Sequence, residues 1–142
     1  MVLRFLAIIL TGLAVIAPAA HLFEYRKKIA MPEDEYFVVQ KIYIGWWLAG
    51  LFLPAAIVAN AILAAQVSGP AFWLAAGAAA LLLLNLAIFV VWTLPVNKAT
   101  RNWTIKQDIW QAQRNQWELS HAVNAGVNFM AFCAAILAAL TA

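Results

Sequence analysis

The sequence predicts an all-α protein, a four-helix transmembrane bundle with both termini on the outer side. Of its 142 residues, 66% are hydrophobic and only 11% are charged. Because an α-helix needs about 20 apolar residues to cross a bilayer, each long uncharged run predicts one span. The uncharged runs are 5–23, 42–67, 70–97 and 119–142. The segments between them are too short for a second domain, so we expect a single domain, 1–142.

Charged residues, proline and glycine set the expected ends of the helices. We expect helices over about 3–25, 36–67, 70–98 and 107–141. Pro32 is followed by three acidic residues, which favours a short surface helix that leads into the second span. Gly45 and Gly50 in the second span, and the AAGAAA run in the third, predict that these two helices approach closely.

The positions of the basic residues predict the orientation. Eight of the nine lie in two segments, 26–41 and 98–114, and only Arg4 lies elsewhere. The positive-inside rule places both segments in the cytoplasm, so the two termini face outward. The net charge of +3 is thereby explained by topology. We expect a multi-pass protein of the bacterial inner membrane whose partner is the lipid bilayer, with no nucleic acid.

Tryptophan is distributed unevenly between the two sides. An aromatic belt places tryptophan at both membrane interfaces, but only Trp73 falls on the outer side. The excess on the cytoplasmic side predicts a cavity with aromatic walls there. The cytoplasmic tryptophans are Trp46, Trp47, Trp92, Trp103, Trp110 and Trp117.

The last span begins with a stripe of polar side chains. At about 100° per residue, its members fall within an arc of about 120° on one helix. Polar groups at membrane depth are costly unless they face the bundle interior, so this stripe is expected to face inward. It consists of Arg114, Trp117, Glu118, His121, Asn124 and Asn128.

Each of the other spans brings counterparts to the same level. His21 and Glu24 lie on one face of the first helix, because they are three positions apart in the sequence. The second and third helices contribute Gln40, Tyr43, Trp46, Trp92 and Asn97. Histidines, glutamates, an arginine and aromatic rings at one depth predict a binding or reactive site open to the cytoplasm.

Two kinds of chemistry fit these residues. The HLFE and ELSH segments place His21 with Glu24 and Glu118 with His121, the spacing that builds carboxylate-bridged metal sites in helical bundles. A metal ion, or haem on the two histidines, is therefore one alternative. The other is acid/base chemistry without a cofactor, since a histidine can remove a proton and an arginine can hold an oxyanion.

The runs LPVNKATRNW and RNQWELSH carry a resemblance to the anthrone oxygenase-like family of small four-helix membrane proteins. The segment HLFEYRKKIAMPEDEYFVVQKIYIGW is similar to a variant found among its bacterial members. The resemblance implies cofactor-independent oxidation of an anthrone to an anthraquinone by molecular oxygen. It also implies that Asn97, Arg114, Trp117 and His121 are functional. Asn124 stands where the family pattern leads us to expect arginine.

We therefore predict an oxidoreductase, a membrane-embedded oxygenase-like enzyme for a flat hydrophobic phenol or anthrone-type substrate. His121 is the expected base with His21 as second candidate, Arg114 stabilises the oxyanion, and Trp117 lines the pocket. The expected substrate-binding residues are Trp46, Gln40, Tyr43, Trp92, Asn97 and Asn124. The alternatives are a metal- or haem-binding protein and a non-catalytic small subunit of a larger membrane complex; a homo-oligomer is compatible with each.

Overall fold

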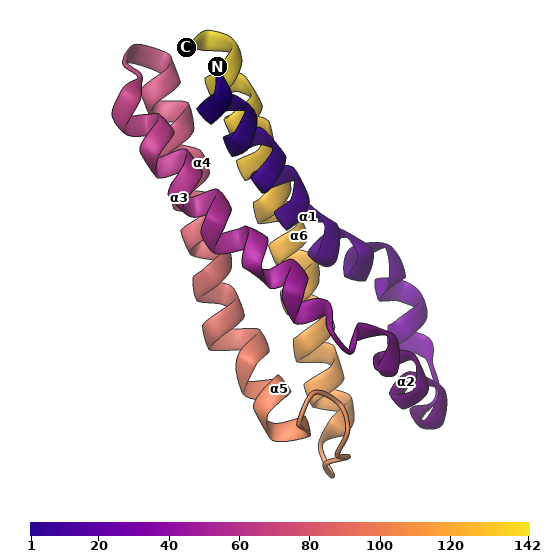
Figure 1. The fold of residues 1–142 in the computed structure, drawn as a ribbon. Coiled ribbons are helices and arrows are strands. Elements are labelled where there is room, and N and C mark those ends of the chain that lie inside the picture. The colour runs from indigo at the N-terminus through magenta and orange to yellow at the C-terminus, as the bar shows by residue number, and fades with distance from the viewer.

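A computed structural model describes the whole chain, residues 1–142, and all of its regular elements are helical. Four helical segments are long and apolar enough to cross a membrane: Val2–Ala30, Trp46–Gln66, Gly69–Thr100 and Trp110–Thr141. They form an elongated bundle with both termini at one end (Figure 1). The predicted all-α bundle of four long apolar helices is confirmed, and by length and composition the chain is a membrane protein.

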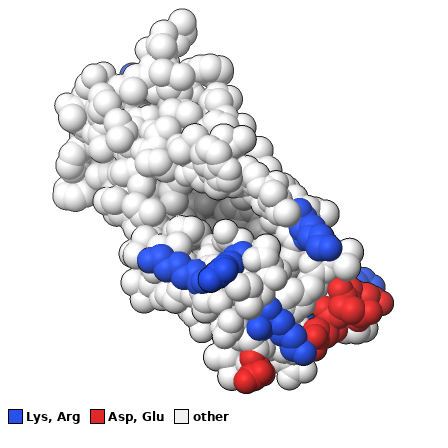
Figure 2. All heavy atoms as spheres, turned by 60° about the horizontal axis from the view of Figure 1, so that its bottom comes forward, with Lys and Arg blue, Asp and Glu red and all other residues white.

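The two ends of the bundle differ in composition. We call the end that holds both chain termini the termini end. The opposite end, which holds residues 31–43 and 101–109, is the charged end. Figure 2 shows most Lys, Arg, Asp and Glu side chains gathered at the charged end.

The first helix, α1 (Val2–Ala30), is longer than the sequence predicted. It passes through Pro18 without a break and ends at Ala30 instead of near residue 25. Lys28 therefore belongs to the helix, and it lies on the face of His21 because seven residues make two turns. Lys28 is only 1% exposed. A residue expected in a basic loop is thus part of the bundle interior.

The predicted second helix, 36–67, is divided. A separate surface helix, α2 (Glu33–Gln40), begins after Pro32 as expected and is followed by the short turn η1 (Lys41–Tyr43). Gly45 then has φ 92°, in the left-handed region that glycine adopts without a steric penalty. This reversal ends the surface segment before the membrane segment begins.

The second membrane segment starts beyond Gly45. It consists of the 3₁₀ turn η2 (Trp46–Leu51) and the helix α3 (Phe52–Gln66). η2 packs on α1 and α3, and α3 packs on α1 and α4. The α-helical part of this segment therefore begins only at Phe52, and the part nearer the charged end is a 3₁₀ turn.

The third segment contains a wide turn. α4 (Gly69–Ile88) continues into the π-helical turn η3 (Phe89–Thr93) and then into α5 (Leu94–Thr100). Pro95 has no N–H to donate to the carbonyl one turn earlier, which accounts for a widened turn directly before it. The last helix, α6 (Trp110–Thr141), runs the length of the bundle and packs on α1 and α4.

Small side chains let the helices approach closely at the termini end. Alanine dominates the buried positions there, as the AAGAAA run predicted for the third span. Gly45 and Gly50 do not mediate the close approach predicted for them, because both are exposed and a Cβ added at either would meet no atom within 4 Å. At the charged end the buried residues are large and aromatic instead. The two clusters are Ala7, Ala59, Leu63, Ala64, Ala75 and Ala138 at the termini end, and Tyr36, Val96, Trp103, Trp110 and Trp117 at the charged end.

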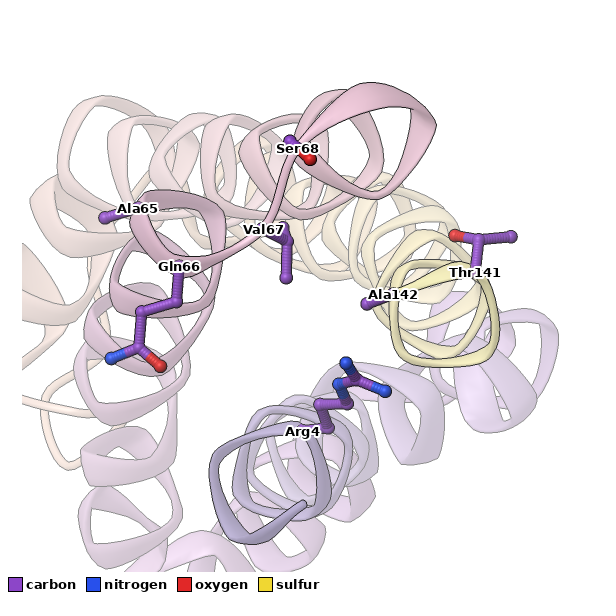
Figure 3. Close-up of a pocket in the computed structure, with 7 residues that line it drawn as sticks. All are labelled: Arg4, Ala65, Gln66, Val67, Ser68, Thr141 and Ala142. Atoms are coloured by element: carbon purple, nitrogen blue, oxygen red, sulfur yellow. The ribbon is translucent and has the colours of Figure 1, made fainter.

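Arg4, the one basic residue outside the two basic segments, lies at the termini end. Arg4 extends toward the space between the helix ends, and Gln66, Ser68 and Thr141 also line this space (Figure 3). Of the eight remaining basic residues, three lie at the end of α1, one is Lys41, and four lie within residues 98–114. The folded chain thus keeps the charge asymmetry on which the predicted orientation depends.

We expect reporter fusions to place the two ends on opposite sides of the membrane. A fusion after Thr104 should report the cytoplasm, and a fusion after Ala142 should report the outer side, because basic segments are retained in the cytoplasm. Alkaline phosphatase and green fluorescent protein fusions at both positions measure this. A C-terminal fusion that fluoresces in the cytoplasm would show that the orientation is wrong.

Candidate functional site

A cavity of about 860 Å³ lies in the half of the bundle nearer the charged end. Its walls come from every helical element of the chain, α1 to α6 with η1, η2 and η3, together with the start of the α5–α6 connection. Figure 2 shows a hollow on this face with Lys and Arg side chains beside it. Among the lining residues are His21, Gln40, Tyr43, Trp46, Asn97, Arg101, Trp103, Trp117, His121 and Asn124.

The seam between α1 and α6 forms the centre of the cavity wall. The ring centroids of His21 and His121 are 4.2 Å apart, and Trp117 lies 4.8 Å from His21 and 4.1 Å from His121. The inward-facing stripe on α6 is therefore confirmed for Trp117 and His121. The structure brings together two imidazoles and an indole.

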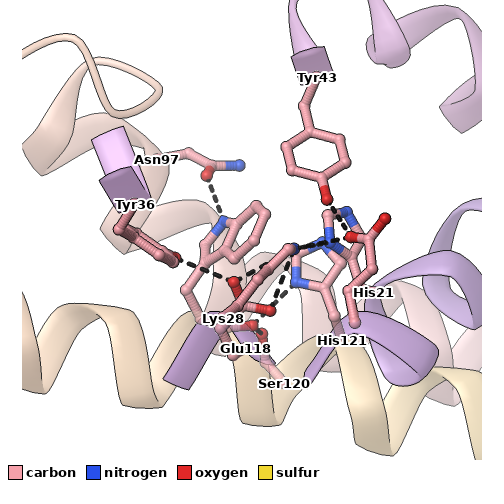
Figure 4. A network of polar contacts seen from close by, with 10 residues as sticks. His21, Lys28, Tyr36, Tyr43, Asn97, Glu118, Ser120 and His121 are labelled. Carbon is pink, nitrogen blue, oxygen red and sulfur yellow. Dashed lines mark hydrogen bonds and ion pairs between the residues drawn. The ribbon is translucent and has the colours of Figure 1, made fainter. Parts of the chain in front are cut away.

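Lys28 is the residue that organises this seam. Its Nζ lies 2.8 Å from Nδ1 of His21, 3.3 Å from Oε2 of Glu24 and 3.2 Å from Oε1 of Glu118 (Figure 4). An ammonium group has three N–H donors and no acceptor, so each donor has one of these partners. Glu118 is fully buried, and Lys28 supplies the opposite charge that a buried carboxylate needs.

These contacts fix the position of the proton on each imidazole. Nδ1 of His21 accepts from the Lys28 ammonium, so the neutral ring carries its proton on Nε2. Nδ1 of His121 lies 2.8 Å from the Trp117 carbonyl oxygen, which can only accept, so this ring carries its proton on Nδ1. One histidine is left with a free N–H and the other with a free nitrogen lone pair.

Two tyrosines complete the polar network at the charged end. The Tyr36 hydroxyl donates to Oε1 of Glu118 at 3.0 Å, and the Tyr43 hydroxyl donates to Oε2 of Glu24. Burial, followed by the neighbouring carboxylate, raises the pKa of the Tyr36 hydroxyl above its ordinary value. Burial and the hydrogen bond to Glu24 likewise raise the pKa of Tyr43. Both phenols therefore remain neutral donors.

Aromatic rings form the wall beside the histidines. The rings of Tyr43 and Trp46 meet edge to face, with centroids 5.0 Å apart, and Tyr43 lies 4.4 Å from His21. Trp117 is held in place by its Nε1, which donates to Oδ1 of Asn97 at 2.7 Å. Asn97 thus lines the cavity, as expected, and uses its carbonyl oxygen to orient the indole.

Two predicted site residues lie outside the cavity. Arg114 donates from Nη1 to the Met31 carbonyl at 2.9 Å, and its guanidinium lies over the rings of Tyr36 and Trp110. Because it ties the α1–α2 connection to α6, it does not reach the histidines. Trp92 faces away as well, and its carbonyl accepts a hydrogen bond from Gln116.

The groups proposed for the metal alternative surround a lysine. The Lys28 ammonium sits between His21, Glu24 and Glu118, where a cation bound to them would lie. The chain has no group of three or more His, Cys, Asp or Glu side chains arranged to hold a metal ion. The imidazoles of His21 and His121, 4.2 Å apart between centroids, leave no room for a flat macrocycle between them.

Two parts of the site could not be recognised from the sequence, namely the buried position of Lys28 and the backbone turn at 101–103, although Trp103 was among the tryptophans expected near a cavity. Lys28 was indistinguishable from its neighbours in a basic run. The second part is the segment Arg101, Asn102 and Trp103, whose φ values of 47°, 55° and 63° are all left-handed. Such values are unfavourable for a bulky residue, and the Thr100 hydroxyl offsets the cost by accepting from the Trp103 N–H at 3.0 Å. This turn places Trp103 over the cavity.

Comparison of the chain with protein-family models, with curated proteins and with solved structures gives no match. Assignment of a function therefore depends on the geometry of the cavity.

Replacing Lys28 with methionine should strongly destabilise the fold. Glu118 would lose its counter-charge inside the bundle, which costs about 3–5 kcal/mol in buried pairs. The double variant Lys28→Met/Glu118→Gln removes both charges and should recover most of this loss. Denaturant unfolding of the detergent-solubilised chain measures the difference.

The matched control breaks an exposed ion pair. Lys106 and Glu33 lie 2.7 Å apart, with side chains 53% and 42% exposed. Lys106→Met should change the stability by only about 0–1 kcal/mol, because water screens such a pair. An equal effect of the two lysine substitutions would contradict the central role of Lys28.

Proposed function

We propose that this chain is a membrane-embedded oxygenase-like enzyme that oxidises a flat hydrophobic anthrone-type or phenolic substrate without a bound cofactor. The observation that supports it is the pair of adjacent imidazoles with opposite proton positions. His121 offers a lone pair on Nε2, and His21 offers an N–H on Nε2. A base can form an enolate by removing a proton, and a hydrogen-bond donor beside it can stabilise the negative charge on the enolate oxygen.

In the proposed reaction His121 removes a proton from the methylene carbon of an anthrone. The electron pair of that C–H bond moves into the rings and places negative charge on the carbonyl oxygen. His21 stabilises this oxyanion by donating from Nε2, the role that the sequence had suggested for Arg114. His121 can hold the proton because its other nitrogen already donates to the Trp117 carbonyl.

Molecular oxygen is the oxidant in the next step. It forms a bond to the deprotonated carbon and is reduced to a peroxide, which becomes a hydroperoxide when His121 returns the proton. Cleavage of the O–O bond with loss of the remaining hydrogen from that carbon releases water and leaves a second ring carbonyl. One anthrone and one O₂ thus give one anthraquinone and one water.

The walls of the cavity suit a flat, membrane-soluble substrate. Tyr43, Trp46 and Trp117 present ring faces and edges on which a polycycle can stack. The resemblance of the LPVNKATRNW and RNQWELSH segments to anthrone oxygenase-like proteins supports the same reaction. We place the chain in the bacterial inner membrane, with the charged end in the cytoplasm, from its basic-residue asymmetry.

We expect the purified chain to consume one O₂ for each anthrone oxidised. His121→Ala should lower turnover by about 10²–10⁴-fold, the usual contribution of a general base. An oxygen electrode and the absorbance of the anthraquinone product measure this. Val123→Ala, on the lipid-facing side of the same helix, is the control and should retain turnover.

Chelators should leave the turnover unchanged, because no step uses a metal. If a chelator abolishes turnover and a metal ion restores it, the alternative site of His21, Glu24, Glu118 and His121 is supported instead. Full activity in His121→Ala would remove the proposed base. Turnover only in the presence of another protein would favour the small-subunit alternative.

Filling the cavity should also inhibit the reaction. Gly50 lines the cavity, and a Cβ added there would meet no other atom within 4 Å. Gly50→Leu should therefore fold normally and raise KM at least about tenfold by occupying space that the substrate needs. Gly126 is equally free of neighbours but lies on the exposed side of α6, so Gly126→Leu is the matched control. Equal kinetics for both variants would place the substrate elsewhere.

A further inference from the structure

One wall of the cavity is also part of the outer surface of the bundle. The side chains of Ile44, Trp47 and Leu51 line the cavity and are nevertheless 75%, 69% and 57% exposed. All three belong to η2 or lie directly before it. Side chains with this exposure cannot be enclosed by protein, so the cavity is open along them. We call the cavity-lining residues between 44 and 54 the open wall.

The packing of the helices explains why this side is open. α3 packs on α4, but η2, which precedes α3, packs on α1 and α3 and makes no extensive contact with η3 or α5. η3 packs on α4, α5 and α6 instead. The second and third membrane segments therefore separate toward the charged end. Leu86 and Phe89 line the cavity from the third segment, across from the open wall.

The opening faces the hydrocarbon part of the bilayer. η2 is the beginning of Trp46–Gln66, one of the four segments that are long and apolar enough to cross a membrane. In Figure 2 uncharged atoms surround the hollow on its termini-end side, and Lys and Arg side chains lie only toward the charged end. Because the charged residues mark the boundary with water, the opening lies on the lipid side of that boundary.

The open wall differs in chemistry from the histidine seam. Its residues are all uncharged, and apart from the indole N–H groups of Trp46 and Trp47 they have no polar side-chain atom. His21 and His121 lie on the α1–α6 seam, and no Asp or Glu lines the cavity. A ligand that matches both walls has a flat polar head at the histidines and an apolar part at the opening.

An alkyl chain is the apolar part that fits best. The cavity volume of about 860 Å³ is near the upper end of the range for ligand pockets, so a tricycle without substituents leaves much of it empty. A polar substituent in the opening would lose its water to apolar surroundings. An alkyl chain loses nothing there, because lipid tails are as apolar as the open wall. A long chain can also continue into the bilayer.

We propose that the substrate carries an alkyl chain on its flat head, and that this chain leaves the cavity between η2 and η3 into the bilayer. The substrate is then a membrane-resident aromatic lipid. This inference rests on the proposed function for the flat head, but its test needs no turnover.

Displacement of radiolabelled 2-methylanthraquinone from the immobilised, detergent-solubilised full chain tests the proposal. The unlabelled competitors are 2-methylanthraquinone, 1-dodecylanthraquinone and 2-dodecylanthraquinone, with concentrations expressed as mole fractions of the detergent phase. This scale removes the preference of the longer chain for micelles. We expect at least one dodecyl competitor to bind within about threefold of the methyl compound, because its chain exchanges one apolar environment for another.

Two substitutions in η2 form a matched pair. Leu51 and Leu48 are 57% and 56% exposed, but only Leu51 lines the cavity. Leu51→Trp narrows the opening and should weaken the dodecyl competitor at least about tenfold, a factor that corresponds to about 1.4 kcal/mol. Binding of the methyl compound should stay within about threefold, because its head lies at the seam and no chain passes the new indole. Leu48→Trp should change neither competitor. The ratio of the two competitors in one sample does not depend on the fraction of folded protein.

A phospholipid could supply an alkyl chain to the same opening. Phosphatidylglycerol is therefore added to the wild-type chain in the same assay. We expect both competitors to retain their affinities on the mole-fraction scale. Selective loss of dodecyl binding on addition of the phospholipid would assign the opening to a lipid chain and overturn the proposal.

The other outcomes separate this inference from the proposed function. Exclusion of both dodecyl competitors by the wild-type chain, a Leu51→Trp variant with an unchanged ratio, or an equal change in Leu48→Trp overturns the chain passage. No binding of 2-methylanthraquinone also overturns it, because the chain would have no flat head. Any of these results with intact oxygen-dependent turnover of anthrone leaves the proposed function standing. The expected displacement without turnover would support the chain passage and reject the oxygenase reaction.

Discussion

A buried ammonium group determines the arrangement of the charged end. Lys28 belongs to a basic run at the end of α1, yet its side chain is buried in the bundle, and a cation there is stable only with acceptors around it. Its three partners come from two helices, since His21 and Glu24 belong to α1 and Glu118 to α6. Glu118 in turn accepts from Tyr36, which fixes α2 against the bundle. The Lys28 ammonium thus holds α1 against α6, supports the contact of α2 with the bundle through Glu118, and determines which nitrogen of His21 carries the proton.

The cavity follows from a change in packing along the bundle. At the termini end, alanine at the contacts lets the backbones approach, and the helices fill the space between them. This close packing does not continue toward the charged end. There the chain reverses at Gly45, forms the 3₁₀ turn η2 and widens into a π-helical turn before Pro95. Large aromatic side chains then occupy part of the widened space, and the remainder is the cavity. The irregular turns are therefore the source of the cavity.

Much of this arrangement was accessible from the sequence. Four apolar runs gave the bundle, and the spacing of Trp117, His121 and Asn124 gave the inward face of α6, because both depend on local periodicity. Arg114 was expected at the site, but its guanidinium contacts the Met31 carbonyl and the rings of Tyr36 and Trp110. Lys28 was assigned to a loop because a basic residue near the end of a span has two solutions, water or a buried partner. Only the tertiary contacts of α1 with α6 decide between them. The division of the second helix was missed because the left-handed conformation of Gly45 leaves no periodic signal.

The surroundings of the two histidines explain why they are not interchangeable. Both are imidazoles at one depth, yet a second proton can be accommodated on only one of them. On His121 it would go to Nε2, while Nδ1–H continues to donate to the Trp117 carbonyl. On His21 it would go to Nδ1, where an N–H would face the N–H of the Lys28 ammonium. His21 is thereby restricted to donating and His121 to accepting. In the proposed reaction, a lysine and a backbone carbonyl would thus set the direction of proton transfer.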